Sequence, residues 1–297
     1  MTADERELIF MTPEQGEAVL ATEAGELEEI FELALEQVAA IPSTHLFKKR
    51  CKNQGVEMGR PSRPEYWRVI AACGRDFADM ERKENGGGLQ VDAAELVAAT
   101  PAYVFAQHAL DKRSFPTKSE KDAAWDLTRY YNQAMRYFGE RNPQVLVDPI
   151  ADGLFAAARL FVTDDTIHEE GLDNIDNVLY SARQKANFGH LLGILGERFR
   201  VANDKESLFG IDFVTNVDAR GSTEIRLDVR TSPVEIQAQG KDTKFSIERS
   251  PKWPPTAKIL TPFMQYELGD RFVESNEVLR AKAEELRPLL ARIHQVA

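Results

Sequence analysis

The sequence contains few of the residues and motifs that build common active centres. Two cysteines, Cys51 and Cys73, are too few for a disulfide framework and too far apart for a zinc or redox motif. The five histidines include no pair at the spacing of zinc ligands. A Walker phosphate loop, a dinucleotide fingerprint and a Gly-x-Ser-x-Gly turn are all absent. The best-marked enzyme classes are therefore excluded, and we expect no cofactor and no metal.

Long hydrophobic runs are also missing. No window approaches eighteen consecutive apolar residues, so we expect no membrane span. The opening MTADERELIF is acidic and lacks the basic-then-apolar order of a secretory signal. A hydrophobic fraction of 43% with 29% charged residues is typical of a folded protein. Together these features predict a soluble cytoplasmic protein.

Hydrophobic spacing predicts an α+β protein that is mostly helical. Apolar residues recur every three or four positions from Leu20 to Ile41, which indicates one long helix that needs a partner helix within the chain or from another copy. Shorter helices are expected between residues 89 and 205, with a capping box at Asp92 and Glu95 and a new start at Thr100-Pro101.

Near residue 207 the hydrophobic period changes to two. This pattern predicts one small antiparallel sheet of three to four strands near residues 207–249, with one solvated face. The prolines at 251, 254 and 255 indicate a stiff loop, and a C-terminal helix follows. The acidic stretch 164–176 is expected to be a solvated loop between helices, and it does not fit a calcium-binding template.

Three regions are expected along the chain. Residues 1–85 form a polarised N-terminal region, residues 89–205 a helical core, and residues 206–297 the sheet with the last helix, packed with the core as one domain. The joint between the first two is Asn85 followed by three glycines, which is typical of a flexible connection.

Charge is distributed unevenly in a chain whose formal net charge is −11. Residues 1–41 carry eleven acidic residues and one arginine, whereas residues 42–68 carry seven cations and two acids. Glycines and prolines within the second stretch predict that most of its cations lie on a loop. We call residues 42–68 the basic segment, and its cations are Lys48, Lys49, Arg50, Lys52, Arg60, Arg63 and Arg68.

The basic segment predicts contact with an acidic protein partner or with nucleic acid. Cations supply phosphate contacts, and the neighbouring Trp67 supplies a ring on which a base can stack. The alternative is that the cations pair with Glu26, Glu29 and Glu36 of the first helix. An acidic helix that folds over the basic segment would compete with an external polyanion for the same cations. The two interpretations can therefore both hold, with the helix acting as an autoinhibitor of polyanion binding.

A second candidate lies in the stretch SARQKANFGH. Arg183 and His190 are seven residues apart, about two helical turns, and so share one helix face. An arginine and a histidine in this arrangement resemble the catalytic pair of HEPN-type ribonucleases, in which they act on the 2′-hydroxyl and the scissile phosphate. The resemblance covers these two residues. The alternative is a surface arginine and a packed histidine.

A third candidate is a set of carboxylates on the expected strands. Asp212, Asp228 and Glu235 with Gln237 form a loose imitation of the divalent-metal site of restriction-type nucleases. However, charges alternate in sign along residues 224–230, as they do on a solvated sheet face.

We therefore expect a non-enzymatic interaction or regulatory protein. It would self-associate or dock through the Leu20–Ile41 helix and contact an acidic partner or nucleic acid through the basic segment. The alternative from another class is a nuclease, either HEPN-like or metal-dependent, for which toxin or phage-defence biology would be a natural setting.

Overall fold

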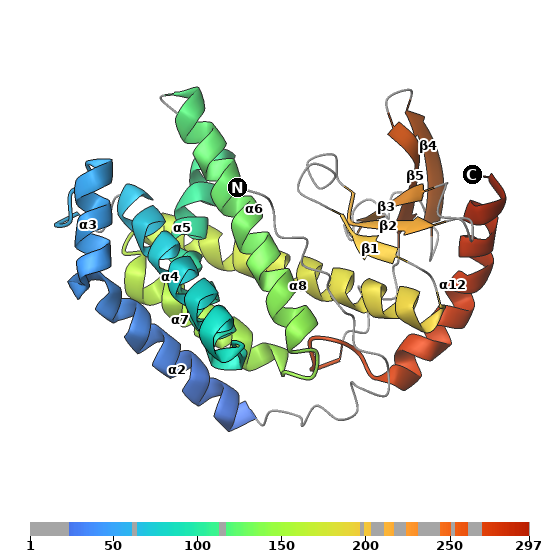
Figure 1. Cartoon of the computed structure of the whole chain (residues 1–297), viewed down its shortest axis with the longest axis horizontal. Helices are drawn as coiled ribbons and strands as arrows, with labels where there is room; N and C mark the ends of the chain where they lie inside the picture. Colours follow the sequence, from blue (N-terminus) through green and yellow to red (C-terminus); the bar gives the residue numbers. More distant parts are fainter. Residues whose placement is uncertain are drawn as a thin grey trace. The chain divides into compact units, whose positions relative to one another are not determined.

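The computed structural model describes residues 24–60, 64–112, 117–196, 199–202, 211–216, 224–230, 244–250, 253–260 and 269–296 (Figure 1). The chain divides into two compact units, of which one spans residues 21–182 and the other is built mainly from residues 183–297. We call them the helical unit and the sheet unit. None of the helices in the described ranges has the length and apolar character needed to cross a membrane.

The helical unit consists of helices joined by short connections. They are α2 (Ala24–Ala40), the 3-10 turn η1 (Ile41–Ser43), α3 (His45–Gln54), α4 (Pro64–Asn85), α5 (Leu89–Asp111), α6 (Lys118–Arg141), α7 (Val147–Phe161) and the first part of α8 (Asp165–Ile194). The glycines at 86, 87 and 88 all have positive φ and form the turn between α4 and α5. The joint predicted there therefore lies inside the helical unit.

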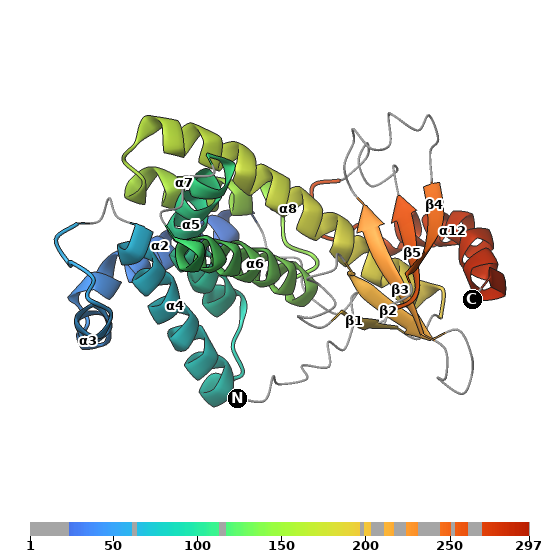
Figure 2. The same cartoon turned by 90° about the horizontal axis from the view of Figure 1, so that it is seen from above.

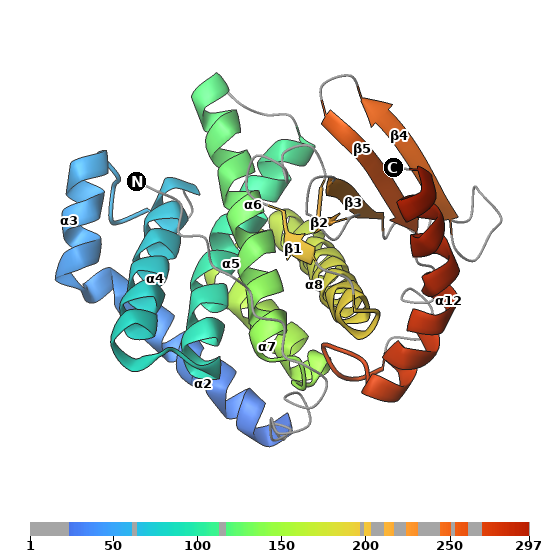
Figure 3. The ribbon, with the colours of Figure 1, turned by 45° about the vertical axis from the view of Figure 1, so that its right-hand side comes forward.

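Helix α5 is the core of this unit. Every residue from Asp92 to Ala106 is buried, as expected for a helix that is largely apolar all round. It packs against α2, α4, α6 and α7, and Figure 3 shows it between α4 and α6. A Cβ at Gly74 of α4 would overlap the Cβ of Ala98, so the glycine permits the close approach of α4 to α5.

The apolar side of α2 is used inside the helical unit. Leu27, Phe31, Ala34 and Val38 are all buried, and α2 packs on α5 and α7. Phe31 occupies the space beside Gly153 of α7, where a Cβ would overlap its ring. The apolar contacts that the sequence predicts for this helix are thus made within the chain over the described residues. Leu20 lies outside the described residues.

Three helix boundaries differ from those predicted. Helix α5 begins at Leu89 and runs through Pro101, so Asp92 and Glu95 are interior residues and not a capping box. Just before Pro101, the hydroxyl of Thr100 donates to the carbonyl of Leu96 at 2.8 Å, so this buried side chain is satisfied inside the helix. Helix α8 already begins at Asp165, so the acidic stretch expected to be a loop is helical.

The sheet unit confirms the predicted fold class, a mostly helical α+β protein with one small sheet. Its strands are β1 (Phe199–Val201), β2 (Phe213–Asn216), β3 (Glu224–Arg230), β4 (Lys244–Ser250) and β5 (Trp253–Leu260), and helix α12 (Asn276–Val296) follows. The strand order is β1-β2-β3-β5-β4, which can be followed in Figure 2.

The sheet has more strands than predicted and is mixed. Strand β5 pairs with β3 in parallel and with β4 antiparallel. Its prolines, Pro254 and Pro255, led to the prediction of a loop. They precede Thr256, where pairing with β3 begins, and lie beside a register shift in β4, and proline is tolerated at such a strand start or irregularity.

Candidate functional site

Most of the described cations of the basic segment lie on a helix and not on a loop, which corrects the prediction. Thr44 caps α3, because its hydroxyl oxygen accepts a hydrogen bond from the amide of Phe47 at 3.2 Å. Gly55 ends the helix with φ 67°, the left-handed conformation that favours glycine. The glycine that indicated a loop therefore terminates a ten-residue helix.

Helix α3 is amphipathic. Phe47 and Cys51 are four residues apart and are both buried. Lys48, Lys49 and Lys52 are all exposed, and their spacings of three and four residues place them on one side of the helix. We call these three residues the lysine face. The helix contains four cations and no acidic residue.

The remaining cations of the basic segment have other surroundings. Arg50 is half-buried and forms an ion pair with Asp76, which attaches α3 to the neighbouring helix α4. Arg60 pairs with Glu57, with 2.9 Å between Nε and Oε2. Arg68 is half-buried on α4. Arg63 lies outside the described residues. The lysine face is therefore the accessible, unpaired part of the predicted site within the described ranges.

Trp67 is 4% exposed and belongs to the core. Its ring packs against Tyr66, with centroids 5.2 Å apart, and against Phe161 of α7, with centroids 5.0 Å apart. The sequence predicts this indole as a stacking surface for a base. Its burial assigns it to the contact between α4 and α7 instead.

The acidic and basic helices are not joined to each other by ion pairs among the described residues. Glu26, Glu29 and Glu36 on α2 are exposed, as are the three lysines of α3. The interpretation that the two charged segments neutralise each other inside one molecule receives no support from these residues. Residues 1–23, which carry the other acids of the N-terminal stretch, lie outside the described ranges.

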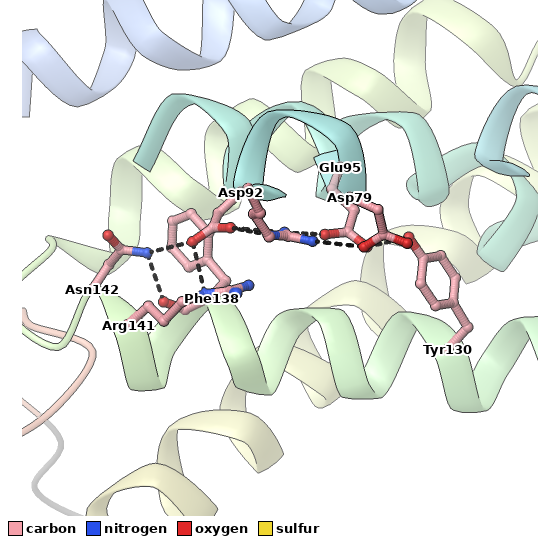
Figure 4. A network of polar contacts seen from close by, with 8 residues as sticks. Asp79, Asp92, Glu95, Tyr130, Phe138, Arg141 and Asn142 are labelled. Carbon is pink, nitrogen blue, oxygen red and sulfur yellow. Dashed lines mark hydrogen bonds and ion pairs between the residues drawn. The ribbon is translucent and has the colours of Figure 1, made fainter. Parts of the chain in front are cut away.

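A buried polar network that the sequence did not indicate joins α4, α5 and α6 (Figure 4). Arg82 of α4 contacts Asp92, with 2.8 Å between Nη2 and Oδ1, and also contacts Glu95. The hydroxyl of Tyr130 donates to Glu95 at 2.5 Å. From the end of α6, Arg141 Nε lies 3.0 Å from Asp92 Oδ2, and Asn142 donates to the same oxygen at 3.2 Å.

The two carboxylates of the network are compensated by the cations and hydrogen-bond donors around them. Burial alone would lower the pKa of Arg82, but Glu95 and Asp92 together raise it above its ordinary value. Burial, with the neighbouring Glu95, raises the pKa of Tyr130, so its hydroxyl stays protonated and can donate. Since both carboxylates already have cations and donors, the arrangement holds three helices together and offers no vacant ligand position.

Arg183 and His190 lie on α8 in the sheet unit. Arg183 Nη2 donates to the carbonyls of Gly269 at 2.6 Å and Arg271 at 2.8 Å, and the residue is buried. Burial lowers the pKa of His190 to about 4, so its imidazole is neutral at pH 7. The guanidinium thus fixes the segment before α12, and no described contact of this pair indicates a phosphate site.

The strand carboxylates are partly described. Asp212 is buried; its Oδ2 accepts from the amide of Val229 at 2.9 Å, and its Oδ1 lies 2.7 Å from Lys185 Nζ. Asp228 lies on β3, whereas Glu235 and Gln237 fall outside the described ranges. Within those ranges no group of three His, Cys, Asp or Glu side chains is placed to hold a metal ion.

Comparison with known proteins adds no functional information. No family model, no curated protein and no solved structure matches the chain.

Proposed function

We propose that this protein is an interaction protein that binds a polyanionic partner, an acidic protein or a nucleic acid, through the lysine face of α3. One observation carries the proposal. Three exposed lysines share one side of a helix, and none has an acidic partner among the described residues. The chain has a net charge of −11, so this local concentration of positive charge opposes the overall balance.

Without a bound partner, the lysine face lowers the stability of helix α3. Lys48 and Lys52 are four residues apart, and like charges at this spacing destabilise a helix by about 0.2–0.5 kcal/mol per pair. Lys52 in the last turn interacts favourably with the helix dipole and offsets part of this cost. Binding of an anion removes the repulsion, whereas no described residue of the chain does so.

The helix is also rigidly held for binding. Phe47 and Cys51 are buried, and the Arg50–Asp76 ion pair adds a polar attachment to α4. Because α3 is already ordered, a ligand does not bear the cost of ordering it. The lysines themselves remain accessible, so the contact is electrostatic and sensitive to salt.

The test is a charge reversal with a matched control. The variant Lys48→Glu/Lys49→Glu/Lys52→Glu leaves Arg50 unchanged, because its ion pair with Asp76 is structural. The control Lys83→Glu/Lys118→Glu/Lys121→Glu reverses three exposed lysines on α4 and α6. Each variant takes the formal charge from −11 to −17, so their net charges are identical.

Binding to a labelled single-stranded oligonucleotide and to polyglutamate would be followed by fluorescence anisotropy at several salt concentrations. The α3 variant should bind more weakly, and for the oligonucleotide its salt slope should be smaller than that of wild type by about 2, since each single-strand phosphate contact contributes about 0.7. The control should retain both affinity and slope. Equal loss in the two variants, or wild-type protein that binds neither polyanion, would overturn the proposal.

A further inference from the structure

Helix α2 presents an acidic surface that matches the lysine face of α3. Its acidic residues are all exposed, and the helix contains no basic residue. Glu28, Glu32 and Glu36 recur every four residues, so their carboxylates follow one side of the helix over about 12 Å. We call these three residues the glutamate stripe.

The two surfaces match in spacing as well as in sign. Lys48 and Lys52 repeat the four-residue step of the glutamate stripe, which is about 6 Å along either helix. Within one molecule the two surfaces are not joined by an ion pair among the described residues. The side of α2 opposite the glutamate stripe is buried against α5 and α7. The side of α3 opposite the lysine face is buried through Phe47 and Cys51.

Each charged surface also includes one exposed leucine. Leu33 on α2 is 41% exposed and follows Glu29 by four residues; Leu46 on α3 is 43% exposed and precedes Lys49 by three. An apolar side chain surrounded by charge is the usual composition of a protein interface, with an apolar centre and a polar rim. A phosphate backbone offers no apolar surface to these leucines, so they favour a protein as the occupant.

We propose that the occupant is a second copy of this chain, with α3 of one copy bound to α2 of the other. The lysine face would meet the glutamate stripe, and Leu46 would lie near Leu33. Because every chain carries both surfaces, a two-fold pair makes this contact twice. The apolar side of α2 is buried in the helical unit, so the association uses the outer, charged side of the helix.

The inference rests on the proposed function in one respect, since both use the lysine face. Self-association and polyanion binding would exclude each other at α3. A free polyanion would therefore dissociate the pair, and the pair would form when no polyanion is present. The dimer is in this way a regulator of the same site.

A charge exchange tests the pair. The variants Lys48→Glu/Lys49→Glu/Lys52→Glu and Glu28→Lys/Glu32→Lys/Glu36→Lys each make α2 and α3 alike in sign. In an equimolar mixture, however, both contacts of a two-fold pair regain opposite charges. Sedimentation velocity should show wild-type dimers that dissociate as salt is added, monomers for each variant alone, and dimers in the mixture.

Three outcomes would overturn the inference: wild-type protein that is monomeric at low salt, either variant forming dimers as readily as wild type, or a mixture that stays monomeric. Circular dichroism shows whether each variant is folded. A second variant, Leu33→Ala/Leu46→Ala, changes exposed side chains only and should raise the dimer dissociation constant about tenfold, the equivalent of 1.4 kcal/mol. An unchanged constant would count against the proposed contact.

The two proposals can fail separately. The Glu28→Lys/Glu32→Lys/Glu36→Lys variant keeps the lysine face and lacks the competing stripe, so as a monomer it should bind the oligonucleotide at least as tightly as wild type. Dimers that form while no protein binds a polyanion would refute the proposed function and support the inference. Polyanion binding by a wild-type protein that stays monomeric would support the proposed function and refute the inference.

Discussion

Phe47 of α3 and Tyr66 of α4 pack edge to face, with their ring centroids 5.2 Å apart. Both side chains are buried, so this contact fixes the cationic helix on the rest of the helical unit. The charged surface and its attachment are therefore on opposite sides of the same ten residues. Changes to the attachment should affect binding without altering any charge.

The substitution Phe47→Ala should lower the free energy of unfolding by about 3 kcal/mol, because it removes a fully buried aromatic side chain and leaves a cavity. The neighbouring Leu46→Ala changes an exposed side chain and should stay within about 0.5 kcal/mol of wild type. Urea denaturation of both variants measures the difference. Equal stabilities would mean that α3 is not held by the Phe47 ring.

The buried network gives a second prediction. Asp92→Asn removes the carboxylate that Arg82 and Arg141 share and leaves buried positive charge incompletely compensated. We expect a loss of about 3 kcal/mol in the free energy of unfolding. Asp79→Asn is the matched control, since Asp79 is half exposed and its nearest contact with Arg82 is 3.5 Å. A control as unstable as Asp92→Asn would show that the cost does not arise from burial.

These positions also show how far the sequence could predict the fold. The change of hydrophobic period near residue 207 correctly indicates a sheet, because side-chain alternation is a local property. However, β1 already lies at Phe199–Val201, in the region expected to be helical. Strand β5 escaped prediction because Pro254 and Pro255 obscure its pattern, and its tolerance of proline depends on its neighbours β3 and β4. Strands β3 and β5 pair in parallel although they are not consecutive in the sequence, so no local stretch of sequence indicates their pairing.

The site was predicted in part for similar reasons. Charge counting located the cations, but burial decides which of them are accessible. Arg50 follows Lys49 directly in the sequence, but it is half-buried and pairs with Asp76, which is twenty-six residues away. Asp92 and Glu95 fit a capping box because two carboxylates three residues apart have the same spacing in either role. The partners Arg82, Tyr130, Arg141 and Asn142 distinguish the network from a cap.

Arg183 provides a third prediction, which separates a structural role from a catalytic one. Its Nη2 donates to two backbone carbonyls, and the lysine side chain is one bond shorter, so its ammonium does not occupy the same position. Arg183→Lys should therefore lower the melting temperature by several degrees, about 2–4 °C for each kcal/mol lost. Arg280→Lys, at an exposed position of α12, should not change it. Wild-type stability in Arg183→Lys would leave the guanidinium available for the ribonuclease role that its spacing from His190 resembles.

The last prediction concerns acid stability and His190. Burial lowers the pKa of this imidazole to about 4, whereas an unfolded chain has a value near 6.5. Between these two values the unfolded state binds the additional proton, so stability is full above about pH 6.5 and falls as the pH decreases toward 4. A pKa difference of this size corresponds to roughly 3 kcal/mol in the free energy of unfolding.

His190→Gln cannot titrate and should lose less stability over that interval, as measured by urea denaturation at pH 7 and pH 4.5. His45→Gln, at an exposed position of α3, should follow the wild-type curve. Parallel losses in wild type and His190→Gln would show that this histidine is accessible to protons in the folded protein.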